Sequence, residues 1–324
     1  MDIVTAFELG LVEDFGSVDD LVIDTVLSKL FFSGDFVYKA YKHRNSDFGD
    51  LSHPEFRKTY HEQDFYWNNL MSPEVYVSLH KVSLIDGYYR ESDGTREDYY
   101  VKMKKIDTRR DLTKILESAH PLLPHELESY VVQITEKLDA LTRTNASSLQ
   151  HFLDLGREHV FDELRAVESW AHSAREHLSS EDIKSAMDQI QYALDSDSYF
   201  QNLKPSDLSV VIDTNPDNVL FLEEGVVFID VMPPKENWRV HDRYFVVCRT
   251  SSDLSAYQRQ QDADQLHTTY GAYAALPSSR VRMVYELASA LIQVPYRVML
   301  GAQKSAEKYA SLVRSHTKIL NSHR

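Results

Sequence analysis

The sequence predicts a two-lobed α+β protein, with a small β-rich lobe over residues 1–105 and a larger, mostly helical lobe over 106–324. Two observations carry this prediction. Up to Lys105, short apolar segments alternate with glycine-containing turns, and one stretch has helical spacing. Beyond Lys105, long stretches with helical spacing dominate and enclose one strand pair near residue 220. We expect a cleft where the two lobes join.

Composition narrows the class of protein. The chain has 324 residues, of which 43% are hydrophobic, and this is ample for a buried core. Its net charge of -15 argues against nucleic acid or an anionic membrane as the main partner, because both select basic surfaces. The single cysteine, Cys248, excludes an internal disulfide and suits a reducing compartment. With no apolar run near the ~20 residues of a membrane span and no basic start, we expect a cytoplasmic protein.

The first predicted element is a β-hairpin over residues 19–42. Its turn is Ser33-Gly34-Asp35, and its second strand carries Lys39 and Lys42. These lysines are an odd number of positions apart, so on a regular strand they face opposite sides. Only one of them can therefore point into a cleft, and the alternative for either is a solvated strand lysine.

The rest of the first lobe contains a helix and more strands. Pro54–Leu70 has the spacing of an amphipathic helix, with Glu62 and Asp64 at its middle. The predicted strands and turns that follow are Glu74–Ile85, the turn Asp86-Gly87, the turn Asp93-Gly94 and Asp98–Met103.

Helical spacing dominates the second lobe. Before residue 200 we predict helices over Leu112–Ala119, Leu127–Leu141, Ser148–His177 and Ser180–Leu194, the last opened by Ser179 or Ser180. Later in the chain come Val240–Ala256, a polar stretch to His267, and helices over Ser278–Leu300, with a kink expected at Pro295, and Ala302–Asn321.

The stretch from Ser209 to Val231 carries the candidate chemistry. Two apolar runs, 218–222 and 226–229, flank Glu223-Glu224-Gly225, which has the length and composition of a tight hairpin turn. Asp213 and Asn218 precede the first strand and Asp230 follows the second. Folding the hairpin would bring these three side chains to the same end.

This order of residues is typical of phosphoryl transfer. The reaction needs a carboxylate to orient the attacking hydroxyl, an amide oxygen and a second carboxylate to hold magnesium, and a lysine on the phosphates. The kinase pattern places its catalytic Asp five residues before the Asn, and a strand pair then leads to a metal-binding Asp. Asp213, Asn218 and Asp230 fit that order. The alternative is an Asx-rich turn with an acid that caps the next segment.

Several segments resemble one known group of proteins. The loop from Val211 to Asn218 is followed by Phe228-Ile229-Asp230, and Ser33–Lys39 forms a turn and a strand that ends in Tyr-Lys. Weaker similarities lie at Asn68–Tyr76 and Tyr100–Lys105. In this order the chain resembles the aminoglycoside phosphotransferase-like branch of the protein-kinase-like superfamily, in a bacterial group of uncharacterised phosphotransferase-like proteins. The resemblance covers roughly residues 24–254 and implies the two-lobed protein-kinase-like fold.

The resemblance implies a role for each matching residue. Lys39 would bind the α and β phosphates of ATP, with Glu62 as its helix carboxylate partner and Asp64 as the rival for that role. Asp213 would be the catalytic base, and Asn218 and Asp230 would bind magnesium. Backbone groups of Lys102, Met103 and Lys104 would contact the adenine.

The sequence departs from the group's pattern at two places. The group has His-Gly before the catalytic Asp, where this chain has Val211-Ile212, and no glycine-rich phosphate loop is present. Two functions follow from this combination. The first is an ATP- and magnesium-dependent phosphotransferase that acts on a hydroxyl of a small molecule, such as a sugar, an aminoglycoside-like compound or an amino alcohol. The second is a pseudokinase-like nucleotide-binding or scaffolding protein without turnover.

Overall fold

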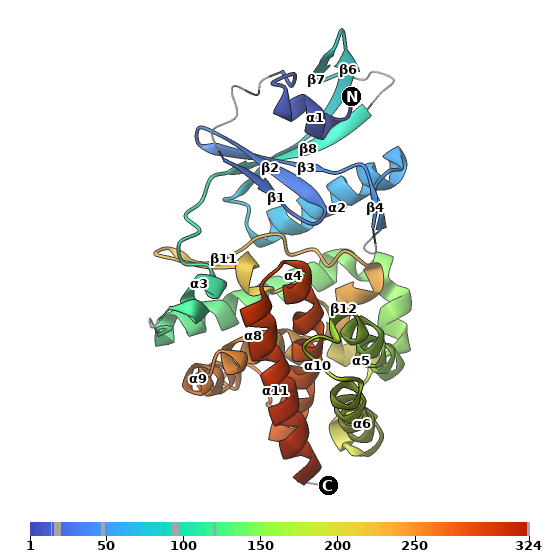
Figure 1. Cartoon of the computed structure of the whole chain (residues 1–324), viewed down its shortest axis with the longest axis vertical. Coiled ribbons are helices and arrows are strands. Elements are labelled where there is room, and N and C mark those ends of the chain that lie inside the picture. Colours follow the sequence, from blue (N-terminus) through green and yellow to red (C-terminus); the bar gives the residue numbers. More distant parts are fainter. Residues whose placement is uncertain (14, 16–20, 47–48, 93–96, 119–120, 323–324) are drawn as a thin grey trace. The chain divides into compact units, whose positions relative to one another are not determined.

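The computed structural model describes residues 1–13, 15, 21–46, 49–92, 97–118 and 121–322 (Figure 1). The turn expected at Asp93-Gly94 and the expected helix end at Ala119 lie outside these residues. The chain divides into two compact units, which are residues 1–108 with 227–235, and residues 109–226 with 236–324. The segment that carries Asp230 therefore belongs to the first unit, although it follows residue 226 of the second in the chain.

The first unit is built on a six-stranded antiparallel sheet, with strand order β1-β2-β3-β8-β6-β7 (Figure 1). Its strands are β1 Val22–Asp24, β2 Ser28–Ser33, β3 Phe36–Tyr41, β6 Tyr76–Ile85, β7 Tyr88–Arg90 and β8 Glu97–Lys104. The unit also contains α1 Ile3–Glu8, α2 Pro54–Met71 and the short pair β4 Asn45–Ser46 and β5 Gly49–Asp50. The predicted turns at Ser33-Gly34-Asp35 and Asp86-Gly87 are confirmed.

The two helices of this unit cover opposite faces of the sheet. On β3, Tyr38 and Ala40 belong to the apolar core that α1 closes, with Phe7 of α1 5.9 Å from Tyr38 between ring centroids. Tyr41 faces the other way and packs edge-on against Tyr60 of α2. Because strand side chains alternate, Lys39 lies on the same face as Tyr41 and α2. Lys42 follows the end of the strand, and the expectation that only one of the two lysines points into a cleft stays a prediction.

Helix α2 begins where the sequence predicts. Pro54 occupies the first turn, where its missing N–H costs no hydrogen bond, and Glu55 follows at the positive end of the helix dipole. The buried residues recur at three- and four-residue spacing and face the sheet; they are Arg57, Tyr60, His61, Asp64, Trp67, Asn68 and Met71. The polar residues on this face, rather than the apolar ones, form part of the candidate functional site.

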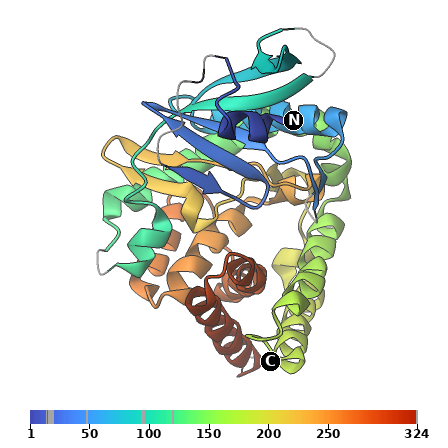
Figure 2. The same cartoon turned by 45° about the horizontal axis from the view of Figure 1, so that its top comes forward.

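The second unit is mostly helical (Figure 2). Its helices are α3 Leu112–Glu117, α4 Pro124–Leu155, α5 Arg157–Ala171, α6 Ser180–Ser196, α7 Ser198–Gln201, α8 Arg243–Ala256, α9 Gln260–Tyr270, α10 Ser279–Met299 and α11 Gln303–Ser322. Strands β9 Leu208–Val210 and β12 Val240–Asp242 pair antiparallel. The predicted cap Ser179 is confirmed, because its side chain accepts the N–H of Asp182.

The hairpin of β10 Val219–Leu222 and β11 Gly225–Phe228 forms as predicted. Gly225 has φ 137°, a backbone conformation that glycine adopts without strain. The helix boundaries near residue 145 differ from the prediction, because α4 continues unbroken through the polar segment to Leu155. Thr142 and Asn145 donate from their side chains to the carbonyls four residues earlier, so residues that weakly favour helix are accommodated there. The helix ends instead at Gly156, with φ 58°.

A second difference lies after residue 256. The polar stretch before His267 is the helix α9, with Ala263, Leu266, His267 and Tyr270 buried along one face. Pro295 lies inside α10, which continues past it to Met299. Among the described residues, no helix is both long and apolar enough to cross a membrane.

Candidate functional site

Lys39 is the centre of a buried ion cluster in the first unit. Its side chain is 4% exposed, and its Nζ lies 3.1 Å from Asp64 Oδ2 and 2.5 Å from Asp230 Oδ1. The ammonium also sits 5.0 Å above the ring of Tyr41. Burying a lysine is costly unless carboxylates compensate its charge, and here two of them do. The structure thus brings Lys39, Asp64 and Asp230 together.

The electrostatics of the cluster keep Lys39 charged. Burial alone would lower the pKa of Lys39, but the carboxylates of Asp230 and Asp64 outweigh burial and hold this pKa well above its ordinary value. Two carboxyl groups share one ammonium, and the side chain of Asp230 is 56% exposed while that of Asp64 is 2% exposed. Asp64 is therefore the fixed partner, and Asp230 is the one that solvent or a ligand can reach.

Asn68 connects Asp64 to the segment that carries Asp230. Its Nδ2 donates to the backbone oxygen and to Oδ1 of Asp64, both at 2.8 Å. Its Oδ1 accepts the N–H of Val231 at 3.0 Å. Asp64 and Asn68 are four positions apart and so lie on one face of α2. One amide side chain thus orients the carboxylate and holds the segment after β11.

Ser72 and Tyr76 continue this row beyond the end of α2. Ser72 Oγ donates to the carbonyl of Phe228 at 2.7 Å and accepts its N–H at 3.2 Å. The hydroxyl of Tyr76 accepts the N–H of Asp230 at 2.9 Å. Asp230 has φ 51°, which is uncommon for a residue with a side chain and costs energy unless its surroundings impose it. The row of α2 side chains and Tyr76 supplies that constraint.

The structure distinguishes the two candidate partners of Lys39. Glu62 is exposed, whereas Asp64 is buried and contacts the ammonium. Two positions along a helix are separated by roughly 200° around its axis, so the two acids cannot face the same way. The assignment of Glu62 as the partner of Lys39 is wrong, and Asp64 takes that place.

The segment expected to contact the adenine is the end of β8. Lys102 places its ammonium 4.2 Å above the ring of Phe36, Met103 is buried, and Lys104 is exposed. The N–H of Lys104 donates to the carbonyl of Val75 at 2.8 Å and is therefore already used within the sheet. A contact between the base and backbone groups of Lys102, Met103 and Lys104 stays a prediction.

Asp213 lies in the second unit, in the loop between β9 and the hairpin. Its Oδ1 accepts from Arg249 Nη2 at 2.6 Å and from the N–H of Asn215 at 3.3 Å. Its Oδ2 accepts from Asn215 Nδ2 at 2.8 Å. The side chain is 20% exposed, so it is held by protein donors and still reaches the surface of its unit. The preceding Val211 and Ile212 are buried.

The rest of this loop is held by helices α3 and α10. Asn215 Oδ1 accepts from Gln293 Nε2 at 2.8 Å. Asp217 accepts from Thr113 Oγ1 at 2.7 Å and from Arg297 Nη1 at 2.9 Å. Asn218 ends a short 3-10 helix, Pro216–Asn218, and is half-buried. Its role as a magnesium ligand stays a prediction.

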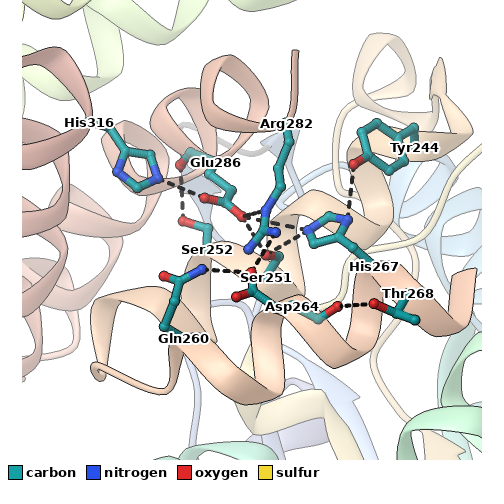
Figure 3. A network of polar contacts seen from close by, with 10 residues as sticks. All are labelled: Tyr244, Ser251, Ser252, Gln260, Asp264, His267, Thr268, Arg282, Glu286 and His316. Atoms are coloured by element: carbon teal, nitrogen blue, oxygen red, sulfur yellow. Dashed lines mark hydrogen bonds and ion pairs between the residues drawn. The ribbon is translucent and has the colours of Figure 1, made fainter. Parts of the chain in front are cut away.

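Helices α8 to α11 are joined by a buried polar network (Figure 3). At its centre, Glu286 accepts from Arg282 Nε at 2.7 Å and lies 2.7 Å from His316 Nε2. Ser251 also donates to Glu286 and lies 2.8 Å from His267 Nε2. Burial would raise the pKa of Glu286, but the two histidines and Arg282 outweigh it and hold this pKa far below its ordinary value. The network fixes α8 and α10, which carry the side chains that hold the loop of Asp213.

Sequence reasoning missed the residues that support the predicted ones. Asn68 and Ser72 follow Asp64 at intervals of four, a polar row that a search of the buried face of α2 would have found. Arg249 and Gln293 lie 36 residues from Asp213 and 78 from Asn215, with no local signal that relates them.

Comparisons with known proteins address the fold. No protein-family model and no curated protein sequence matches the chain. A thermostable mutant of aminoglycoside phosphotransferase APH(4)-Ia, solved with AMP-PNP and hygromycin B, is similar with a TM-score of 0.52 and 15% identity, over 97% of this chain and 98% of that one. APH(2'')-IIia, solved with GDP and kanamycin, is similar with a TM-score of 0.52 and 13% identity, over the same shares of the two chains.

A third solved structure agrees with these. Aminoglycoside 2'-phosphotransferase-IIIa, solved with GDP, has a TM-score of 0.50 and 12% identity, over 98% of this chain and 97% of that one. At such identities the likeness shows the fold alone. The chain thus has the two-lobed kinase-like fold of the aminoglycoside phosphotransferases, and the fold class predicted from the sequence is confirmed.

Proposed function

We propose that the protein is an ATP- and magnesium-dependent phosphotransferase that acts on a hydroxyl of a small molecule, such as a sugar, an aminoglycoside-like compound or an amino alcohol. The observation that carries the proposal is the buried ammonium of Lys39 between Asp64 and the exposed carboxylate of Asp230. A buried, charged lysine with one fixed and one reachable carboxylate is what a site for a phosphate chain and its metal requires.

In this proposal Lys39 binds the α and β phosphates while Asp64 keeps it in place. Asp230 and Asn218 supply oxygen ligands, which suit hard magnesium better than nitrogen or sulfur would. The fit is best supported at Asp230, because its carboxylate is half-exposed and its backbone is held by Tyr76. When bound, magnesium would neutralise negative charge on the transferring phosphoryl group.

Asp213 is proposed to orient the acceptor hydroxyl and to accept its proton. Its carboxylate is held on both oxygens and remains partly exposed, so one face can meet a substrate. Phosphoryl transfer depends mainly on positioning and on charge stabilisation, and a fixed carboxylate serves the first of these. The similar solved structures hold AMP-PNP with hygromycin B and GDP with kanamycin, so both ATP and GTP should be tested as donors.

A second candidate is a nucleotide-binding protein without turnover. One observation favours it: buried Val211 and Ile212 stand where the resembling group has His-Gly. Both candidates share the nucleotide site and differ only at Asp213. The acceptor reaction therefore separates them.

The test compares Lys39 with Lys42, the other lysine of the hairpin, which bonds to Asp24 instead. Lys39→Met should abolish measurable binding of Mg·ATP and Mg·GTP by calorimetry, and Lys42→Met should retain it. Equal binding by the two variants would reject Lys39 as the phosphate ligand.

Turnover by the wild type and by Asp213→Asn decides between the two candidate functions. With a panel of hydroxyl compounds, Asp213→Asn should bind nucleotide and lose about 10²–10⁴-fold in turnover, the range for a positioned acid or base. Nucleotide binding by the wild type without turnover of any acceptor would support the second candidate.

A further inference from the structure

The carboxylate of Asp213 needs donors other than the two residues that precede it. Val211 and Ile212 are 4% and 1% exposed, and their side chains have no polar atom. These side chains therefore cannot donate a hydrogen bond to the acid that follows them. In the resembling group, a histidine precedes the acid by two positions. In this protein other residues must orient Asp213.

Arg249 of α8 and Asn215 meet this need directly. Arg249 Nη2 lies 2.6 Å from one carboxylate oxygen, and Asn215 Nδ2 lies 2.8 Å from the other. With a donor on each oxygen, rotation of the carboxylate plane is restricted. The Arg249 side chain is 17% exposed, so its charge is only partly screened by water.

Asn215 is oriented in turn by Gln293 of α10. Gln293 Nε2 donates to Asn215 Oδ1 at 2.8 Å, and Gln293 itself is 2% exposed. This bond fixes which end of the Asn215 amide faces Asp213, because the acceptor oxygen is turned to Gln293 and the donor nitrogen to the carboxylate. Helix α8 thus contacts Asp213 directly through Arg249, and α10 acts on it through Gln293 and Asn215.

Both helices are held in register near these residues (Figure 3). Ser251, two positions after Arg249, donates to Glu286, and Ser252 Oγ donates to the carbonyl of Glu286 at 3.0 Å. Glu286 lies on α10, seven positions before Gln293. Side chains presented by helices that are tied together in this way hold a reactive group more accurately than loop residues do.

We propose that Arg249 is a positioning residue for Asp213, assisted by Gln293 through Asn215, and that this pair substitutes for the missing His-Gly. The inference rests on the proposed phosphotransferase function. Arg249 orients the carboxylate toward the acceptor hydroxyl. In a loose transition state the proton leaves late, so an oriented carboxylate of modest basicity suffices.

The test uses Arg249→Met, Arg249→Lys and a matched control, Arg243→Met. Arg243 lies on the same helix and pairs with a different acid, Asp139, at 2.5 Å. With the best acceptor of the panel, Arg249→Met should lower kcat by about 10–100-fold, the usual effect of losing a supporting residue. KM for Mg·ATP should change by less than about twofold, because nucleotide binding does not depend on Asp213. Arg249→Lys should recover part of the loss, and Arg243→Met should leave kcat unchanged.

A further readout distinguishes positioning from a general structural effect. The double variant Asp213→Asn with Arg249→Met should be no slower than Asp213→Asn alone, since Arg249 acts only through Asp213. A full additional loss in the double variant would overturn the proposal.

The outcomes also distinguish the positioning role of Arg249 from the proposed phosphotransferase function on which it rests. A wild type that turns over an acceptor, with an Arg249→Met variant of equal kcat, rejects the positioning role alone. A wild type that binds nucleotide and turns over no acceptor rejects the phosphotransferase function and the positioning role with it. If Arg249→Met does not fold, Arg249→Lys and Gln293→Met carry the same comparison, with a smaller expected loss of kcat.

Discussion

The cluster around Lys39 and the network around Glu286 both contain buried charged groups, but they differ in the exposure of the partners. In the Lys39 cluster, the side chain of Asp64 is 2% exposed and that of Asp230 is 56% exposed. In the Glu286 network, the partners of Glu286 itself are Arg282, His267 and His316, with side chains between 6% and 17% exposed. Arg282 also pairs with Asp264, whose side chain is 59% exposed. The exposed carboxylate of the first cluster therefore contacts the central ammonium, whereas that of the second contacts an arginine beside the central carboxylate.

This difference helps to distinguish a functional cluster from a structural one in the same chain. Burial and ion pairs are common to both, so neither identifies a site. A second carboxylate and a reachable oxygen occur in both, because Arg282 contacts Glu286 and the exposed Asp264. The distinguishing feature of the Lys39 cluster is that its reachable carboxylate belongs to a strained residue, Asp230, and contacts the central buried ammonium. The Glu286 network instead joins helices α8, α9, α10 and α11 (Figure 3).

The largest expected effect is on the stability contributed by the Glu286 network. Glu286→Gln leaves the buried charge of Arg282 without its main partner, and breaking a buried ion pair in this way costs about 3–5 kcal/mol. Urea denaturation should show this loss in the free energy of unfolding. Nucleotide affinity, measured below the transition, should change little because Glu286 is not in the proposed nucleotide site.

The matched control is Glu307, which also pairs with an arginine and a histidine, Arg314 and His177, but is 55% exposed. Glu307→Gln should cost less than about 1 kcal/mol, because water already screens an exposed pair. Equal losses in the two variants would show that burial does not strengthen the ion pairs of Glu286.

The next effect is the response to acid, which centres on a histidine behind the Lys39 cluster. Burial lowers the pKa of His61 to about 4, and its ring packs 4.6 Å from that of Tyr41. The unfolded chain takes up this proton near pH 6.5, so the stability from His61 is complete above that pH and is lost as pH falls toward 4. The loss approaches about 3 kcal/mol at the acid end.

His61→Gln removes this titration and can keep the bond to the carbonyl of Arg57. The free energy of unfolding should then depend less on pH between 6.5 and 4. His53→Gln, at a histidine whose side chain is 75% exposed, serves as the control and should leave the dependence unchanged. A slope that is the same in wild type and His61→Gln would contradict the burial of a neutral ring.

A smaller effect tests the open end of the Lys39 cluster. Asp230→Asn should reduce the amount by which magnesium strengthens ATP binding, and a coupling of this kind is typically about 5–150-fold. The free energy of unfolding should fall by less than in Glu286→Gln, because Asp64 still compensates the buried charge of Lys39. Asp24→Asn is the control, since Asp24 is also an exposed acid paired with lysines. Unchanged magnesium coupling in Asp230→Asn would remove Asp230 from the proposed metal site.

The sequence was sufficient for the parts of the structure that depend on local pattern. The hairpin of β10 and β11 followed from two apolar runs around Gly225, and α2 followed from Pro54 and its periodicity. Periodicity could also have chosen Asp64 over Glu62, because Asp64 shares the buried face of Tyr60 and Trp67. To choose between the two acids, one must ask which face of the helix each lies on, and not only which acid lies near the middle of the helix.

Other features depend on contacts that no local pattern records. The segment 227–235 joins the first unit through bonds from Asn68, Ser72 and Tyr76, which are over 150 residues away in the chain. The continuity of α4 depends on side chains that bond back to their own helix, which propensity alone does not show. Arg249 reaches Asp213 only because α8 and the loop meet in the folded unit.

The smallest expected effect concerns how Asp230 is held in its strained conformation. Tyr76→Phe removes one hydroxyl, which accepts the N–H of Asp230 at 2.9 Å, and keeps the buried ring. The loss in the free energy of unfolding should be about 1 kcal/mol, the net value of one hydrogen bond. Without this bond, Asp230 can relax from φ 51°, so magnesium-coupled ATP binding should weaken by a few-fold and less than in Asp230→Asn.

Tyr99→Phe, on β8, loses only a long bond of 3.4 Å to Glu97 and should change neither quantity. A Tyr76→Phe variant that loses stability with unchanged magnesium coupling would show that the backbone of Asp230 is set by Lys39 and Asn68 without help from Tyr76.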